Sequence, residues 1–189
     1  MSPVSRAFNQ DVGIDQLNTR EVVIRNDPKL LRWLLTRDKN PDLQQALECA
    51  AARGNIEVVD IPIERGAPIK DSMAMHYALF CEDHDSRICI MEHLLQHGMG
   101  VNHLGNTPGT RAGGTPLFTA ANMSALNLVA EVQWLLDHGA DPRIRDRLSR
   151  HAIQYALHSG ELRRLLRDQR RVLDSLEAGE LGLTGLTGP

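Results

Sequence analysis

One ending recurs three times along the chain and constrains the fold more than any other feature. Each copy is an apolar, helix-like run that closes on glycine: the endings are Ile63–Ala67, Leu94–Gly98 and Leu135–Ala140. Glycine best tolerates the left-handed backbone that follows a helix end. A second short apolar stretch with small residues precedes each ending, at Ala50-Ala51, Ala78 and Ala120-Ala121. This recurrence predicts a repeat protein made of antiparallel helix pairs, each followed by an extended loop.

Composition excludes several classes of function. Hydrophobic residues make up 42% of the 189 residues and charged residues 24%, which is typical of a soluble globular protein. A net charge of -3 gives no basis for nucleic-acid binding or for a polybasic membrane anchor. The first 15 residues contain no apolar run resembling a signal peptide, and no stretch is long and apolar enough for a membrane span. We therefore expect a cytoplasmic or nuclear protein.

The third repeat unit shows the clearest motif. It begins with Gly114–Ala121, of sequence Gly-Thr-Pro-Leu-Phe-Thr-Ala-Ala, and ends with Trp134–Pro142, of sequence Trp-Leu-Leu-Asp-His-Gly-Ala-Asp-Pro. These segments resemble the ankyrin-repeat family, whose units open with Thr-Pro-Leu-His-x-Ala-Ala and close with Leu-Leu-x-x-Gly-Ala-Asp. Phe118 stands where the family has histidine. Weaker matches extend the resemblance over residues 42 to 142: Ala50–Val59, His76, Ala78, Gly98 and Asn102.

The resemblance implies an all-α fold, an ankyrin-repeat solenoid of stacked helix-turn-helix units with extended loops. We predict a single domain over residues 1–178, with repeats at roughly 12–40, 42–71, 72–112, 113–146 and 147–178. The outer two serve as atypical caps, because one face of a terminal repeat meets water. Residues 179–189 are predicted to form a flexible, glycine-rich tail. At His76 the resemblance implies a hydrogen bond that ties neighbouring loops.

Insertions distinguish this chain from a regular repeat. We predict extra loop residues at 81–86 and 122–127, and an enlarged loop at 103–114. Insertions in repeat proteins map to loops on one face, which is often the binding face. Pro62 lies inside a predicted second helix, which it should kink or shorten.

Histidines, cysteines and acids raise two further hypotheses. Cys89, His93 and His97 share one helical face, but a structural zinc site needs four ligands, usually from two elements. We therefore expect neither a metal nor a cofactor. The run Asp83-His84-Asp85 could orient a general base, although no nucleophile motif accompanies it. The sequence thus assigns no catalytic residue and favours binding over catalysis.

The resemblance implies that a protein partner docks on the concave face, which is made of extended loops and first helices. Tyrosine and arginine are common at interface hot spots, so Tyr77 and Arg111 are the foremost candidates. The complete predicted set is Tyr77, His103, Asn106, Arg111, Phe118, Met123, Arg145 and Arg147.

An alternative function stays open at this stage. The insertions at 81–86 and 103–114 could close over the concave face and form a pocket for a small molecule or for an unusual reaction. That alternative predicts an apolar cavity holding Tyr77, Phe80 and Phe118.

Overall fold

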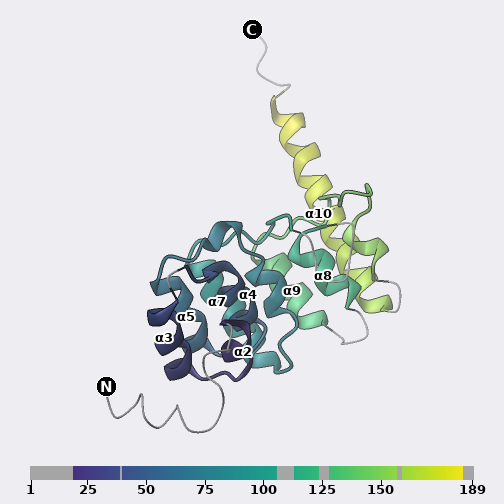
Figure 1. Cartoon of the computed structure of the whole chain (residues 1–189). Helices are drawn as coiled ribbons and strands as arrows, with labels where there is room; N and C mark the ends of the chain where they lie inside the picture. Colours follow the sequence, from purple (N-terminus) through teal and green to yellow (C-terminus); the bar gives the residue numbers. More distant parts are fainter. Residues whose placement is uncertain (1–18, 39, 106–112, 124–127, 157–158, 185–189) are drawn as a thin grey trace. The chain divides into compact units, whose positions relative to one another are not determined.

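A computed structural model describes residues 19–38, 40–105, 113–123, 128–156 and 159–184. The regular secondary structure of these residues is helical, and none of them lies in a β-strand; one isolated antiparallel bridge joins Gly105 and Gly114. The predicted all-α class is therefore confirmed for the described part of the chain (Figure 1). Within that part, no helix has the length and apolar character needed to cross a lipid bilayer.

The chain divides into two compact units, residues 1–93 and residues 94–189, which are described separately. The first unit contains α2 (Thr19–Ile24), α3 (Pro28–Arg37), α4 (Leu43–Ala51), α5 (Ile56–Glu64), the 3-10 turn η2 (Ile69–Asp71) and α6 (Ala74–Ala78). Helix α7 (His84–Gln96) begins in the first unit and ends in the second. The five predicted repeat boundaries stay a prediction.

Polar side chains set the helix starts in the first unit. The Asp27 carboxylate accepts hydrogen bonds from the backbone N–H groups of Lys29 (2.9 Å) and Leu30 (3.1 Å), and Pro28 occupies the first turn. Asn55 caps α5 in the same way. Each cap satisfies backbone donors that a helix start leaves unpaired.

The core of the first unit forms around α4. This helix packs against α2, α5 and α6, and α3 packs against α2 and α5 (Figure 1). Leu31, Leu47, Ile61, Met75 and Leu79 are fully buried there. Small residues on α4, Ala46, Ala50 and Ala51, are also buried, as the close approach of paired helices requires.

Two local expectations in the first unit have clear outcomes. Residues 84–86 form the first turn of α7, so the predicted insertion loop at 81–86 is shorter than expected. The reason is a cap: Asp83 accepts a hydrogen bond from the backbone N–H of Ser86 at 2.8 Å. Pro62, which we expected to kink or shorten its helix, lies in the last turn of α5. The helix ends two residues later, at Glu64.

The second unit contains α8 (Pro116–Asn122), α9 (Val129–Asp137), the 3-10 turn η4 (Ala152–Gln154) and α10 (Gly160–Thr184). Helix α9 packs against α8 and α10, and η4 packs against both α8 and α10. Leu117, Leu128, Leu135, Leu162 and Leu166 are buried in its core.

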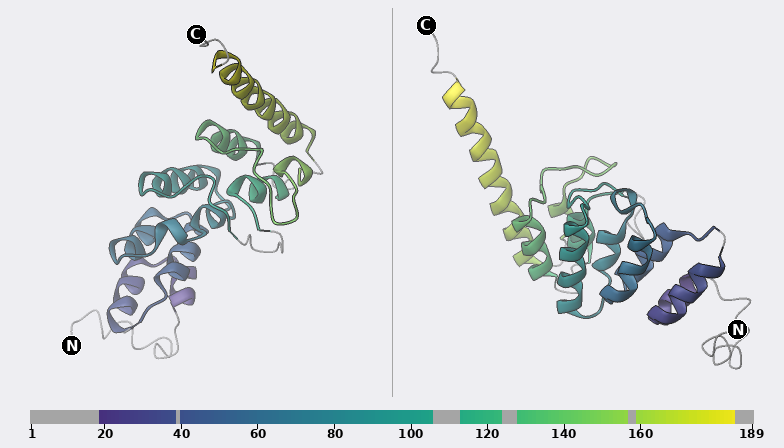
Figure 2. Two further views of the ribbon diagram at one scale, coloured as in Figure 1. Left: turned by 90° about the horizontal axis from the view of Figure 1, so that it is seen from above. Right: turned by 90° about the vertical axis from the view of Figure 1, so that its left-hand side faces the viewer.

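Helix α10 is one uninterrupted helix (Figure 2). It continues to Thr184, past residue 178, where the sequence placed the start of a flexible tail. The predicted glycine stops are also present: Gly66, Gly98 and Gly139 have φ values of +88°, +85° and +90°. These left-handed conformations are strained for residues with a side chain.

Candidate functional site

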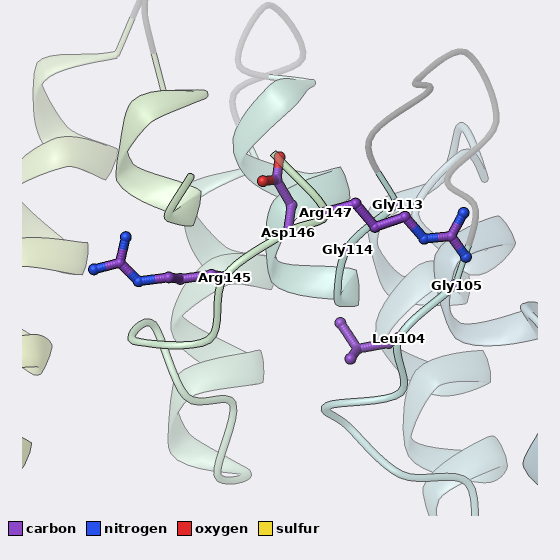
Figure 3. A pocket seen from close by; sticks show the side chains of 7 residues that line it. All are labelled: Leu104, Gly105, Gly113, Gly114, Arg145, Asp146 and Arg147. Carbon is purple, nitrogen blue, oxygen red and sulfur yellow. The ribbon is translucent and has the colours of Figure 1, made fainter. Parts of the chain in front are cut away.

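Two loops of the second unit enclose a half-open hollow of about 250 Å³ (Figure 3). One loop enters α8 and the other follows α9. The lining residues are Leu104, Gly105, Gly113, Gly114, Arg145, Asp146 and Arg147. A space of this size accommodates a side chain rather than a drug-sized ligand, which needs at least about 300 Å³.

Glycines form the stem of the first loop. Gly105 and Gly114 exchange two backbone hydrogen bonds, with N···O distances of 3.0 and 2.8 Å. Gly113 has a φ of +60°, and a Cβ atom there would lie 3.1 Å from the Gly105 carbonyl oxygen. The same Cβ would lie 3.4 Å from Nε of Arg147, an ordinary contact distance, so the Arg147 side chain lies beside the stem.

Two aromatic side chains, Phe118 and Tyr155, pack next to the stem of the hollow. A Cβ atom on Gly114 would lie 2.8 Å from Cγ of Phe118, so the stem backbone rests on this ring. Phe118 is buried, and its ring meets Tyr155 edge-on with centroids 5.5 Å apart. Such edge-to-face pairs stabilise a fold beyond the area they bury. The pair links the start of α8 to η4.

A buried carboxylate fixes the second loop. Asp146 accepts hydrogen bonds from the backbone N–H groups of Leu148 and Arg150, both at 2.8 Å. It also accepts from Nε of Arg150 at 3.1 Å and from the Tyr155 hydroxyl. Burial alone would raise the pKa of Asp146, but the hydrogen bonds outweigh burial and lower it. The carboxylate is therefore ionised near neutral pH and fully occupied by its own loop.

The Tyr155 hydroxyl is the donor in its hydrogen bond with Asp146. Burial, together with the hydrogen bond to Asp146, raises the pKa of Tyr155 to about 12. The phenol therefore stays protonated and keeps donating to the carboxylate.

A second polar contact ties neighbouring loops together. The Asn102 side chain donates to the Gly139 carbonyl oxygen and accepts from the backbone N–H of Asp141, each at 2.9 Å. Asp141 in turn accepts from the backbone and the guanidinium of Arg143. Asn102 lies immediately before the stem of the hollow, so this contact fixes the stem against the loop that follows α9.

Two arginines remain exposed at this surface. Among the described residues, Arg147 has no hydrogen bond or ion pair, and Arg145 has one, from Nη1 to the Ser149 carbonyl oxygen at 2.9 Å. Their side chains extend to opposite sides of Asp146 (Figure 3). Leu104 and Leu148, on the same two loops, are each 60% exposed. These four side chains are available for contact with a second molecule.

The predicted partner-binding residues do not all lie here. Arg145 and Arg147 line the hollow, and His103 precedes Leu104 at its edge. Phe118 is only 4% exposed, whereas a residue that contacts a partner is expected to be accessible. It is buried because Gly114 and Tyr155 pack against its ring, and its part in partner binding stays a prediction. Met123, half-buried, follows the last residue of α8 and is not among the lining residues.

Tyr77 lines a different hollow, in the first unit. Its neighbours there are Arg20, Asp42, Gln44, Gln45, Glu48 and Cys49. Burial raises the pKa of Tyr77. Asn106 and Arg111 lie outside the described residues, so their predicted roles stay predictions.

The alternative function predicts an apolar pocket lined by aromatic side chains. None of the described residues that line the hollow in the second unit is aromatic. In the first unit, the Asp83 carboxylate that suggested catalysis instead caps α7. Its hydrogen bonds with Ser86 lower its pKa. His93, considered above as a zinc ligand, has its Nε2 atom 2.6 Å from Oδ1 of Asp60.

Sequence reasoning missed Leu104 and Leu148 as surface residues. Each is an apolar residue within a polar loop, and that context is the signal that could have indicated exposure. Asp146 was missed as an organising residue, because its partners are recognisable only once the loop is folded.

Comparison with known proteins bears directly on this unit. Residues 112–147 match the ankyrin repeat family. The matched segment runs from the stem of the hollow, through α8 and α9, to Arg147. No curated protein sequence matches the chain.

Proposed function

We propose, from the ankyrin repeat at residues 112–147, that the chain is a protein-protein interaction module that binds its partner through the loops of the second unit. The contact surface comprises residues 103–105 and 145–149, which we call the loop face. This assignment narrows the predicted concave face to the part whose geometry is described.

The observation that carries the proposal is the contrast between fixed loops and exposed side chains. The buried Asp146 accepts half-buried hydrogen bonds from the backbone of its loop, and Asn102 donates an exposed one to the Gly139 carbonyl oxygen. Leu104, Leu148 and Arg147 nevertheless point away from the core. Preorganised loops reduce the entropy that binding costs, because the backbone is already ordered.

The composition of the loop face agrees with this function. Exposed apolar side chains next to arginine are typical of interface centres, where arginine is enriched. Catalysis would require a nucleophile or a general base in the hollow, and its one carboxylate is occupied by Tyr155 and Arg150.

Affinity capture with matched variants tests the proposal. Leu104→Asp and Leu148→Asp place a charge on the loop face, and Leu176→Asp places the same charge on α10. All three leucines are 60% exposed, so the variants differ in location and not in burial. Circular dichroism checks that each variant folds.

We expect a stoichiometric partner to be captured by the wild type and by Leu176→Asp, and to be lost by Leu104→Asp and Leu148→Asp. Equal capture by all three variants would contradict a binding role for the loop face.

A further inference from the structure

The loop face carries two positively charged side chains that form few contacts within the described fold. Arg145 and Arg147 are both exposed, and between them they make one hydrogen bond within the described residues. The chain as a whole has a net charge of -3. The positive charge of this surface is therefore local.

Asp146, the one acid among the described residues that line the hollow, cannot neutralise these arginines. Asp146 is buried and accepts bonds from Arg150, Tyr155 and two backbone N–H groups. Arg150 is already its ionic partner, with Nε 3.1 Å from Oδ2. Within the part of the chain that the structure describes, the charges of Arg145 and Arg147 thus stay uncompensated.

The direction of the two side chains restricts the ligand. They diverge on either side of Asp146, with Arg147 lying over Gly113 (Figure 3). This separation of the two guanidinium groups favours a ligand with several separated negative charges over one small anion. An extended peptide advances about 3.3 Å per residue, so carboxylates several residues apart can reach both.

The remaining features of the face also fit a peptide. The hollow of about 250 Å³ between the arginines accommodates one side chain. Leu104, at its edge, provides an apolar contact beside the charges. Guanidinium groups bind carboxylates with strong, charge-assisted hydrogen bonds.

We infer that the partner presents an extended acidic segment, with aspartate or glutamate residues that pair with Arg145 and Arg147 and an apolar residue that packs against Leu104. The inference rests on the proposed function and names the chemistry of its partner.

The experiment begins with selection from a random linear peptide library by the full-length protein. The enriched peptides are synthesised in two forms, one as selected and one with each aspartate or glutamate replaced by asparagine or glutamine. Fluorescence anisotropy then measures the affinity of both forms.

Two double variants locate the charge. Arg145→Gln with Arg147→Gln removes the arginines of the loop face, and Arg164→Gln with Arg167→Gln removes two exposed arginines from α10. Both double variants change the net charge equally, so any difference between them reports position.

We expect the selected peptides to be rich in aspartate and glutamate, and the loop-face double variant to bind them roughly tenfold more weakly. The α10 variant should bind like the wild type. Neutral peptides should bind weakly and equally to all three proteins. Raising the salt from about 0.1 M to about 1 M shortens the screening length from about 10 Å to about 3 Å, and should weaken wild-type binding the most.

Several results would overturn the inference: selection of peptides without acidic residues, equal affinity of the neutral forms, or tighter binding of a single-stranded oligonucleotide. If the arginine changes have no effect while Leu104→Asp abolishes binding, the acidic partner is wrong and the loop face still stands. If neither the leucine nor the arginine changes alter peptide binding, the proposed function at this face fails as well.

Discussion

The two units use their polar side chains in different ways. In the first unit, long-range polar contacts join one helix to another. Arg65, at the end of α5, donates to the Leu35 carbonyl oxygen of α3 at 2.7 Å, and His93 of α7 pairs with Asp60 of α5. These contacts are partly exposed, and exposed pairs contribute little to stability.

In the second unit, the corresponding contacts hold loops. Asn102 bridges to the backbone at Gly139 and Asp141, and the buried Asp146 organises its own loop and Tyr155. In the second unit, the buried Asp146 and the half-buried Asn102 thus keep loops in one conformation, which suits the proposed binding surface.

Removing the Asp146 carboxylate should break this arrangement most strongly. Asp146→Ala leaves the Tyr155 hydroxyl and the loop N–H groups without their acceptor, so we expect a loss of about 2–4 kcal/mol from the free energy of unfolding of the second unit. Asp60→Ala, its counterpart in the first unit, should cost less than about 1 kcal/mol.

Urea denaturation can measure each unit separately, because the chain has two tryptophans, Trp33 on α3 and Trp134 on α9. Trp33→Phe leaves a fluorescent reporter for the second unit, and Trp134→Phe leaves one for the first. A larger loss for Asp60→Ala than for Asp146→Ala would reverse the comparison between the units.

Acid should produce a smaller effect with the same origin. The pKa of Asp146 is lowered in the folded protein, so its contribution is present above the unfolded value of about 3.9 and is lost as the pH falls through the folded value. The protonated carboxyl still fills its site, so the loss is smaller than for alanine. Unfolding of the Trp33→Phe protein at pH 5 and at pH 3 measures it, and Asp146→Asn should flatten this pH dependence. An unchanged pH dependence in Asp146→Asn would exclude this carboxyl as the cause.

Gly113→Ala should be next in size. The left-handed φ of +60° costs strain for alanine, and its Cβ would press on the Gly105 carbonyl oxygen at 3.1 Å. Gly66→Ala is the matched control in the first unit, because Gly66 has a φ of +88° and no atom within 4 Å of its Cβ position.

We expect a loss of about 1 kcal/mol for Gly66→Ala and of about 2 kcal/mol for Gly113→Ala, measured by the same urea experiment. Equal losses would mean that the Gly105 stem yields to the added methyl group.

Local features of the fold could be predicted from the sequence, and features that need distant partners could not. The glycine stops depend on one residue and its neighbours, and Gly66 and Gly139 have the expected left-handed backbone. Phe118 is buried because Tyr155 and the Gly114 stem meet its ring, and no period in the sequence indicates that meeting.

The residues of the candidate site also differ in whether the sequence alone could predict their positions. Arg145 and Arg147 were recognisable because charged loop residues are usually exposed. Asp146, between them, has the same sequence context and is nonetheless buried. Its burial depends on Tyr155 and Arg150 reaching it, which the folded loop alone determines.

The smallest predicted effect concerns a buried hydroxyl of the second unit that forms no hydrogen bond within the described residues. Thr115 stands at the start of α8 and is fully buried, and among the described residues its hydroxyl makes no hydrogen bond. A buried hydroxyl without a partner costs stability, so Thr115→Val should raise the free energy of unfolding of the second unit by up to about 1 kcal/mol.

Thr119, also buried on α8, does have an interaction partner, so Thr119→Val should instead destabilise the unit. Urea unfolding of both variants in the Trp33→Phe background measures the pair. A loss of stability in Thr115→Val would mean that its hydroxyl does bond within the folded protein, and that polar groups of the second unit serve its helices as well as its loops.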